Sequence, residues 1–367
     1  MFRLRLRSPT GSHRNAMPNM THCLLEIRRY FSIRNNSATV PIQKPAVIQR
    51  RSAKDRRSKI PARPERISTF ELAIPFLLLV TLPGIVGLQG CSARRVPAKT
   101  ENTAVLVGAG DIADCRNLSG AEATANLLDK IPGTVMAVGD LAYPDGTAAN
   151  FACYDKTWGR VKNRTRPAAG NHEFHSAGAA VYFQYFGETA GDPGKGYYSY
   201  ELGSWHIVVL NSECAAAGGC DAASAQGKWL REDLAAHPVA CTLAYFHKPL
   251  FSSGGAHGND LVMKSLWDAL YAANADVIVN GHDHDYERFA PQNPDGVADA
   301  SRGIREFVVG TGGKNLRPFA VVRANSEVRY LDAFGVLKLT LAPGSYQWEF
   351  IPQAGKSFQD SGAGTCH

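Results

Sequence analysis

The sequence predicts a layered α/β domain over residues 103–367. Short apolar runs alternate there with segments whose apolar residues recur at helical spacing, which is typical of strands and helices packed in layers. Towards the C-terminus the apolar runs follow one another without helical segments between them, which indicates a second sheet packed on the first. The region is long enough to bury one sizeable core.

The individual elements follow from the same patterns. Residues 103–110, "TAVLVGAG", and 134–139, "TVMAVG", are apolar and end in glycine, so we expect buried strands there. Residues 119–130 between them show helical spacing after a serine, which favours a helix start. By the same criteria the remaining predicted strands are 205–211, 241–246, 276–281, 305–311, 334–341 and 345–351, and the remaining predicted helices are 224–237 and 260–274.

A basic segment precedes this domain. Residues 1–66 contain sixteen Lys and Arg against three acidic residues, whereas the rest of the chain contains 24 basic and 30 acidic residues. The formal net charge of +7 therefore belongs to the first segment, and we expect no nucleic-acid binding by the domain. We interpret residues 1–66 as a disordered tail or as sequence upstream of the true start.

Residues 67–91 have the composition of an export signal. The segment "LAIPFLLLVTLPGIVGLQGC" is apolar but is interrupted by Pro75, Pro83 and Gly84, which suits a signal better than a spanning helix. Its end, "LQGC", resembles a bacterial lipoprotein box, in which Cys91 would carry lipid and attach the protein to a membrane. A plain cleaved signal and a retained anchor are the alternatives. Residues 92–102 would be a linker, and we expect an exported protein, periplasmic or extracellular.

Cysteine usage agrees with export. An even number of cysteines in an exported chain predicts disulfides. Cys214 and Cys220 flank five residues and are predicted to close a small loop, and we expect Cys241 to pair with Cys366 near the C-terminus. Buried free thiols are the alternative. Beyond Cys91 the chain contains Cys115, Cys153, Cys214, Cys220, Cys241 and Cys366.

Side chains that bind metals follow several of the predicted strands, at the point where each strand ends. In open α/β sheets functional sites lie beyond the carboxyl ends of the strands, so these side chains are expected to meet. Each has an ordinary explanation alone, because Asp after Gly is common in turns, Asn caps helices and a lone His is usually a bystander. Their recurrence predicts a metal site formed from Asp111, Asp140, Tyr143, His247, His282 and His284, together with Asn171 and His172 from a separate loop.

These residues lie in five blocks, "GDIA", "GDLAY", "GNHE", "AYFH" and "GHDH". In this order the blocks resemble those of the calcineurin-like metallophosphoesterases, and within them the purple acid phosphatases. "GHDHDYERF" and "KGYYSYELGSWHIVVLNSE" add to the resemblance. The sequence departs from the family at Ala113 and Ala244, where the family has Gly and Val, and neither change removes a ligand. The resemblance implies a four-layer α/β/β/α sandwich of two mixed β-sheets flanked by helices, with residues 103–367 as the catalytic domain.

The resemblance also implies a pair of metal ions. Most members of the superfamily have a histidine two residues after the first aspartate, but Ala113 occupies that place here. Purple acid phosphatases use the tyrosine of GDxxY instead, which is Tyr143; a packed loop aromatic is the alternative. Because a phenolate favours Fe(III), we expect Fe(III) with divalent Fe, Zn or Mn. By resemblance, Asp111, Tyr143 and His284 would hold the first metal and Asn171, His247 and His282 the second, with Asp140 bridging.

The reaction that the resemblance implies is phosphate-ester hydrolysis, in which a hydroxide bridging the metals attacks phosphorus in line with the leaving group. His172 would donate a proton to the leaving group, and His257 would face the substrate, with a mobile polar loop as the alternative for His257. We expect both imidazoles to be protonated at mildly acidic pH. Four further carboxylates are expected to be supporting or solvated groups, namely Asp114, Glu173, Asp283 and Asp285.

The favoured activity is that of a phosphatase acting on phosphomonoesters. A phosphodiesterase or nucleotidase on the same scaffold is the alternative, since loops rather than metals select the substrate. A non-catalytic surface protein that binds metals is a third reading. It is less favoured because structural sites are coordinatively closed and often contain thiolates, whereas this set contains oxygen and imidazole ligands.

Overall fold

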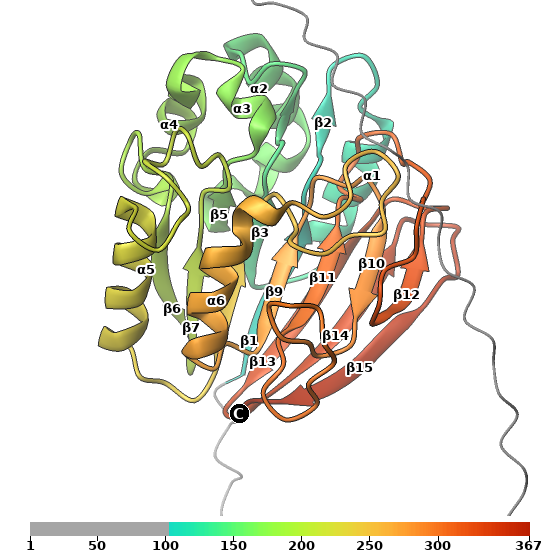
Figure 1. Cartoon of the computed structure of the whole chain (residues 1–367). Helices are drawn as coiled ribbons and strands as arrows, with labels where there is room; N and C mark the ends of the chain where they lie inside the picture. The colour runs from blue at the N-terminus through green and yellow to red at the C-terminus, as the bar shows by residue number, and fades with distance from the viewer. Residues whose placement is uncertain (1–102) are drawn as a thin grey trace, which may run out of the picture. The chain divides into compact units, whose positions relative to one another are not determined.

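Apolar runs form the centres of two sheets in the part of the chain that the structure describes. The computed structural model describes residues 103–367, and Figure 1 shows the two sheets layered one against the other, with helices on the outside. The predictions for residues 1–66, 67–91 and 92–102, including the lipid on Cys91, lie outside the described residues.

The first sheet has six strands in the order β15-β14-β13-β1-β3-β5. Strands β1, β3 and β5 are parallel to one another. β13 pairs antiparallel with β1, β14 with β13, and β15 with β14. The strands are β1 (Ala104–Ala109), β3 (Thr134–Val138), β5 (Thr165–Ala168), β13 (Gly335–Ala342), β14 (Ser345–Pro352) and β15 (Asp360–Thr365).

The second sheet has seven strands in the order β12-β10-β11-β9-β8-β7-β6. β7, β8, β9 and β11 are parallel, with antiparallel strands at both edges. The strands are β6 (Tyr198–Leu202), β7 (Trp205–Val209), β8 (Thr242–Tyr245), β9 (Val277–Asn280), β10 (Tyr286–Phe289), β11 (Arg305–Val309) and β12 (Ser326–Tyr330). A two-stranded ribbon joins β2 (Ala113–Asp114) to β4 (Ala142–Tyr143).

The helices cover the outer faces of the sheets and the loops above the strand ends (Figure 1). Two of the starts match the predicted caps, since Ser224 accepts a hydrogen bond from the amide of Gly227 and Asp260 accepts one from Val262. No helix among residues 103–367 is both long enough and apolar enough to span a bilayer. The helices are α1 (Ser119–Leu128), α2 (Ala148–Lys156), η1 (Trp158–Arg164), α3 (Asn171–Phe174), η2 (Ala177–Ala179), α4 (Ala180–Phe186), η3 (Gly187–Ala190), α5 (Ala225–Ala236), η4 (Leu261–Met263) and α6 (Lys264–Ala272).

Alternate residues of the second sheet belong to two different hydrophobic cores. In β7, Ile207 and Val209 pack into the core between the sheets, whereas Val208 packs beneath α5 and α6. In β9, Val279 packs into the core between the sheets and Ile278 packs beneath the helices. Because neighbouring side chains of a strand point to opposite faces, a continuously apolar strand can be buried on both sides. The predicted four-layer α/β/β/α sandwich is therefore confirmed.

Some strands lack the apolar pattern by which strands are predicted from sequence. β15, "DSGAGT", has no large apolar residue, and a Cβ on Gly362 or Gly364 would lie 2.3 Å from the ring of Trp348 or 2.4 Å from that of Tyr346. This strand exists because small residues fit under aromatic rings of β14, its antiparallel partner. β5 contains Pro167, which is tolerated because β5 lies at the edge of its sheet.

Three disulfides link the described residues. Cys214–Cys220 closes the predicted short loop, and Cys241–Cys366 attaches the C-terminus to the start of β8, as predicted. The third bond joins Cys115 to Cys153. The Cys241–Cys366 bond spans a sequence separation of 125 residues, so it restricts the unfolded chain more than the other two do.

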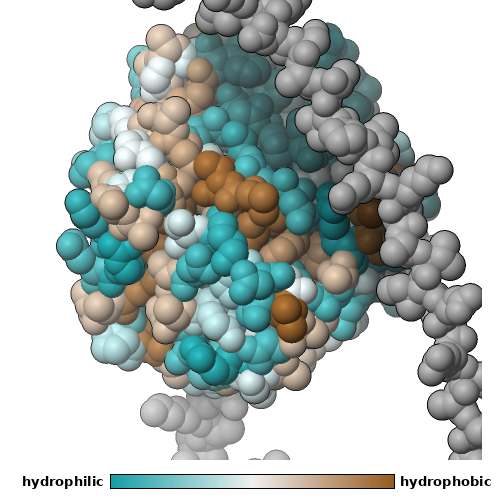
Figure 2. All heavy atoms as spheres, in the orientation of Figure 1, coloured by the Kyte–Doolittle hydropathy of each residue, from teal (hydrophilic) through white to brown (hydrophobic). Residues whose placement is uncertain are grey.

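Figure 2 shows an apolar patch on the face that carries η4 and the start of α6. Leu261 and Val262 are exposed in η4, directly after the loop that contains His257. Val321 and Val322, in the loop before β12, are also exposed.

Candidate metal centre

Four parallel strands deliver the candidate ligands to one edge of the two sheets. Asp111 follows β1, Asp140 follows β3, His247 follows β8, and His282 and His284 follow β9. The sheets meet at this edge, because the amide of Gly110 after β1 donates to the carbonyl of Val309 in β11 at 2.9 Å. The candidate side chains therefore converge from separate parts of the sequence.

Three of the candidates have backbone conformations that non-glycine residues rarely adopt. The φ angles are +60° at Asp111, +52° at Asp140 and +73° at His282. Each such residue costs about 1–3 kcal/mol of folding free energy, and residues of this kind cluster at functional sites. Half of the positive-φ non-glycine residues in the described part of the chain are candidate ligands, which points to a functional edge.

Glycines before the ligands allow the loops to approach one another. A Cβ on Gly139 would lie 2.5 Å from the ring of His247, and one on Gly170 would lie 2.2 Å from a carboxylate oxygen of Asp140. Any larger residue would push the ligands apart. Glycine is therefore required in the "GD" and "GN" blocks because a side chain there would collide with the candidate ligands.

A first group of side chains contains Asp111, Tyr143 and His284. The hydroxyl of Tyr143 lies 2.7 Å from Oδ1 of Asp111 and 3.2 Å from Nε2 of His284. The same Nε2 lies 3.2 Å from Asp111 Oδ1. These three atoms surround a common point, and all three side chains are buried.

A second group contains Asp140, His247 and His282. His247 Nε2 lies 3.1 Å from Asp140 Oδ2 and 3.1 Å from His282 Nδ1. These three residues form a buried cluster with the spacing of a metal site. Tyr143 connects the two groups, because its hydroxyl lies 3.1 Å from Asp140 Oδ2. Asp140 thus stands between the groups, where the resemblance places the bridging ligand.

Backbone carbonyls orient two of the imidazoles. His247 Nδ1 donates to the carbonyl of Val138 at 3.0 Å, and His284 Nδ1 donates to that of Asn315 at 2.8 Å. Each Nε2 lone pair is therefore directed at the carboxylates, which is how metal-binding histidines are usually held. Without a cation, Nε2 of His247 and Nδ1 of His282 would face each other with at most one proton between them.

Asn171 also has a donor atom that is free to bind a cation. It is the first residue of α3, beside Asp140, whose Oδ1 accepts the amide of the next residue, His172, at 2.9 Å. Its Oδ1 is buried and has no hydrogen-bond partner among the described residues. A buried carbonyl oxygen without a donor is costly unless a cation completes it. The donor set of carboxylates, imidazoles, a phenol and an amide oxygen therefore fits two hard or borderline metal ions.

The charges at the site favour a cation. Burial, and then the neighbouring carboxylates of Asp111 and Asp140, raise the pKa of Tyr143 well above its usual range. Burial opposes the charges of Asp140 and His247, but their attraction prevails, lowering the pKa of Asp140 and raising that of His247 to about 10. Tyr143 can thus ligate as a phenolate only beside a cation that displaces its proton.

His172 lies at the solvent side of the site. Its ring packs on that of Tyr143 with centroids 4.2 Å apart, and its Nδ1 donates to the carbonyl of Pro144. Nε2 lies 3.7 Å from Asp140 Oδ2, and 24% of the side chain is exposed. The tip of the imidazole is accordingly directed at the candidate metal groups and accessible to a substrate.

His257 is held over the second group. Its ring stacks on that of His282 with centroids 3.9 Å apart, and Nε2 accepts a hydrogen bond of 3.1 Å from Nη1 of Arg317. Partial burial lowers the pKa of His257; the negative charge of Asp283 opposes this shift and the positive charge of Arg317 adds to it. A lowered pKa narrows the pH range in which His257 would be protonated, compared with a free imidazole.

Two carboxylates that the sequence left without a specific role support these residues. Glu173 is fully buried and accepts four backbone N–H groups, from Asp140 and Gly170 on one oxygen and from Leu141 and Ala142 on the other. It thereby connects two ligand-bearing loops. The position of Glu173 in the "GNHE" block is the sequence feature that could have indicated this role.

Asp283, between the two histidine ligands, has a comparable role. Its carboxylate accepts hydrogen bonds from Ser252 Oγ at 2.5 Å and from the amides of His257 and Gly258 at 3.1 and 2.9 Å. It fixes the loop that places His257 over His282. Lys314 was also not identified from the sequence. Its Nζ lies 4.8 Å from the ring centroid of Tyr143 and forms an ion pair with Asp114 at 2.5 Å.

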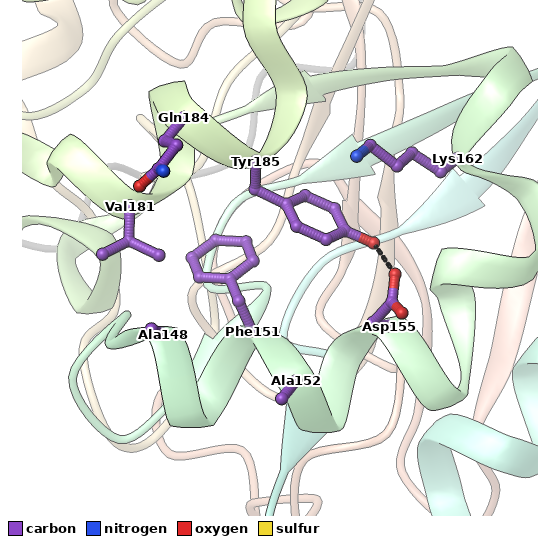
Figure 3. A pocket seen from close by; sticks show the side chains of 8 residues that line it. All are labelled: Ala148, Phe151, Ala152, Asp155, Lys162, Val181, Gln184 and Tyr185. Carbon is purple, nitrogen blue, oxygen red and sulfur yellow. Dashed lines mark hydrogen bonds between the residues drawn. The ribbon is translucent and has the colours of Figure 1, made fainter.

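A separate hollow of about 440 Å³ lies between α2, η1 and α4 (Figure 3). Its walls include Phe151, Lys162 and Tyr185, whose hydroxyl donates to Asp155 at 2.5 Å. None of the candidate ligands lines it. Its lining contains no histidine.

A family model for calcineurin-like phosphoesterases matches residues 98–286. The chain belongs to the calcineurin-like phosphoesterase family. The matched range includes every block that holds a candidate ligand, so the predicted family is confirmed.

This calcineurin-like phosphoesterase is similar to plant purple acid phosphatases. It is 26% identical over 201 residues to purple acid phosphatase 15 of Arabidopsis thaliana, covering 45% of this chain and 37% of that protein. It is 30% identical over 210 residues to purple acid phosphatase 18 of the same plant, covering 52% and 46%. The chain spans about half or less of the length of the curated relatives it matches.

Solved structures share the fold of this calcineurin-like phosphoesterase at low sequence identity. The purple acid phosphatase PPD1 of yellow lupin has a TM-score of 0.59 and 20% identity, covering 71% of this chain and 53% of that one. GAP50, the anchor in the inner membrane complex of Plasmodium, has a TM-score of 0.57 and 11% identity, covering 72% and 89%. Because one is described as a phosphatase and the other as an anchor, fold alone does not decide for catalysis.

Proposed function

We propose that this protein is a dinuclear metal-dependent phosphatase that hydrolyses phosphomonoesters. The observation that carries the proposal is the pair of three-residue groups joined through Asp140, with their donor atoms directed at two adjacent points. Three disulfides among the described residues support an exported protein, with a lipid on Cys91 as the attachment to a membrane.

The ligand groups suit different metals. Asp111, Tyr143 and His284 would hold Fe(III), since a phenolate is a hard anionic donor. Asn171, His247 and His282 would hold divalent Fe, Zn or Mn, and Asp140 would serve both ions. When bound, the pair would polarise the phosphoryl oxygens and supply hydroxide as the nucleophile.

His172 would act on the leaving group. Because Pro144 accepts from its Nδ1, the ring is oriented with Nε2 towards the site. In its charged form, His172 would donate the Nε2 proton to the leaving oxygen of the substrate. The partial exposure of the ring allows it to regain a proton from solvent after each turnover.

The assay that tests the proposal compares mono- and diesters. Protein loaded with iron and a divalent metal is expected to hydrolyse p-nitrophenyl phosphate faster than bis(p-nitrophenyl) phosphate, measured as kcat/KM. A preference for the diester would indicate the phosphodiesterase alternative. Two bound metals without turnover of either ester would favour a non-catalytic metal-binding protein.

Replacing Tyr143 by Phe is expected to abolish the visible charge-transfer band of the iron-loaded protein. Phe retains the ring that packs on His172 and lies beneath Lys314, but it removes the oxygen ligand. Affinity for Fe(III) should fall by at least the roughly 10- to 100-fold seen when supporting residues of metal sites are changed. Absorption spectra and metal analysis measure both effects.

Tyr154→Phe is the matched control, because the Tyr154 hydroxyl is buried and has no hydrogen-bond partner among the described residues. That variant should keep the band. A colourless iron-loaded wild-type protein, or an unchanged spectrum in Tyr143→Phe, would remove Tyr143 from the ligand set.

A further inference from the structure

Two loops form one rim of the metal centre and are joined along their length. Gly255 donates to the carbonyl of Pro318, and Ala320 donates to that of Ser253, each at 2.9 Å. A Cβ on Gly255 would lie only 2.6 Å from the Pro318 oxygen, so the contact is close. The loop with His257 and the loop after β11 therefore act as one wall.

Arg317 lies on this wall beside the ligand residues. Its amide donates to the carbonyl of His284 at 3.0 Å, which fixes its backbone to a candidate metal ligand. Its guanidinium donates to Nε2 of His257, whose ring covers His282. The guanidinium is thus positioned one imidazole ring away from the second group of ligands.

The charge of Arg317 has no counterpart in the described part of the chain. Arg323, in the loop that continues from this wall towards β12, donates to the carbonyl of Ser252. No carboxylate lies within ion-pair distance of Arg317 among the described residues, and the side chain is partly exposed. A planar guanidinium with unused donors is suited to bind a phosphate group.

We propose that Arg317, oriented by His257, binds a second phosphate adjacent to the one that reacts, so that the preferred substrates are organic or inorganic diphosphates. This inference rests on the proposed function, because it assigns the reacting phosphate to the metal centre. The guanidinium contacts the imidazole that stacks on His282, so a phosphate bound to Arg317 would lie beside a phosphate bound at the second group of ligands. Arg317 thereby selects the substrate.

The reaction at such a substrate balances as a hydrolysis. Water adds its oxygen to the terminal phosphorus and releases one proton to solvent, and the bond from that phosphorus to the bridging oxygen breaks. The bond electrons leave with the second phosphate, whose increased negative charge the guanidinium offsets. The charge of Arg317 would therefore stabilise the leaving group as well as the bound substrate.

Binding of non-hydrolysable analogues to the metal-loaded protein tests the inference by calorimetry. The wild type is expected to bind methylenediphosphonate more tightly than methylphosphonate. Arg317→Met should weaken methylenediphosphonate roughly 10- to 100-fold, the range for charge-assisted hydrogen bonds, and should leave methylphosphonate nearly unchanged. Arg317→Lys should recover part of the loss, because the charge remains without the planar fork.

Arg302→Met is the matched control, because Arg302 is an exposed arginine bonded to Asn274. Equal losses of both analogues in Arg317→Met, or no loss, would overturn the second-phosphate site. Arg317-dependent binding without turnover of p-nitrophenyl phosphate would refute the proposed function but support the site. Hydrolysis rates for pyrophosphate and for a nucleoside diphosphate distinguish inorganic from organic substrates. A preference for either over p-nitrophenyl phosphate that Arg317→Met removes would support the site.

Discussion

Asp140→Asn is expected to reduce kcat for phosphomonoester hydrolysis on the order of 10³-fold or more. Asp140 is the residue between the two ligand groups, and its Oδ2 lies 3.1 Å from both Tyr143 and His247. The change removes one negative charge where two cations would share it, and metal ions contribute several kcal/mol to such reactions. Asn accepts the +52° φ angle of this position as readily as Asp, so the loop should persist.

Two measurements separate loss of chemistry from loss of folding. Metal analysis of Asp140→Asn should show fewer than two ions per chain, while thermal unfolding should remain cooperative. His247→Ala should have the same effect through the loss of an imidazole ligand. Asp332→Asn, at an exposed loop position, is the control and should keep full activity. Persistent turnover in both site variants would refute a dinuclear mechanism.

Glu173→Gln is expected to lower the free energy of unfolding by about 2–6 kcal/mol, because it leaves two buried backbone donors without acceptors. The native carboxylate accepts two N–H groups on each oxygen, at distances of 2.8–3.2 Å. An amide NH₂ in place of one oxygen would face two donors. The variant should also lose metal, since the same hydrogen bonds hold Asp140 in its left-handed conformation.

Denaturant unfolding of the metal-free proteins measures this change without a contribution from bound ions. Glu232→Gln, an exposed residue of α5, provides the matched control and should differ from the wild type by no more than about 0.5 kcal/mol. Wild-type stability in Glu173→Gln would mean that the four hydrogen bonds are replaceable by water.

Several features could be predicted from the sequence because their causes are local or repeated. Continuous apolar runs predicted strands, such as residues 205–211, and β7 forms there with its residues divided between two cores. The order of the "GD", "GN" and "GH" blocks indicated the family, and the family match includes all of them. An even number of cysteines in an exported chain predicted disulfides, and the expected bond between Cys241 and Cys366 is observed.

Other features depended on contacts between distant segments. β15 has no apolar signal, and it forms because Gly362 and Gly364 fit beneath rings of β14. Asp283 and Glu173 resemble ordinary polar residues in the sequence, yet each accepts several hydrogen bonds from loops far along the chain. A carboxylate's role is set by the donors around it, and those donors are known only after folding.

The sequence by itself determined the family, the layered fold and the set of side chains that could bind metals, because strand periodicity and ordered motifs are written in neighbouring residues. Only the tertiary structure decided which backbone groups and carboxylates hold these ligands in place, such as Glu173 beside Asp140, and that the guanidinium of Arg317 lies against His257 at the rim. The physical reason is that charge, hydrogen bonding and burial act between atoms a few ångströms apart, which sequence separation does not report.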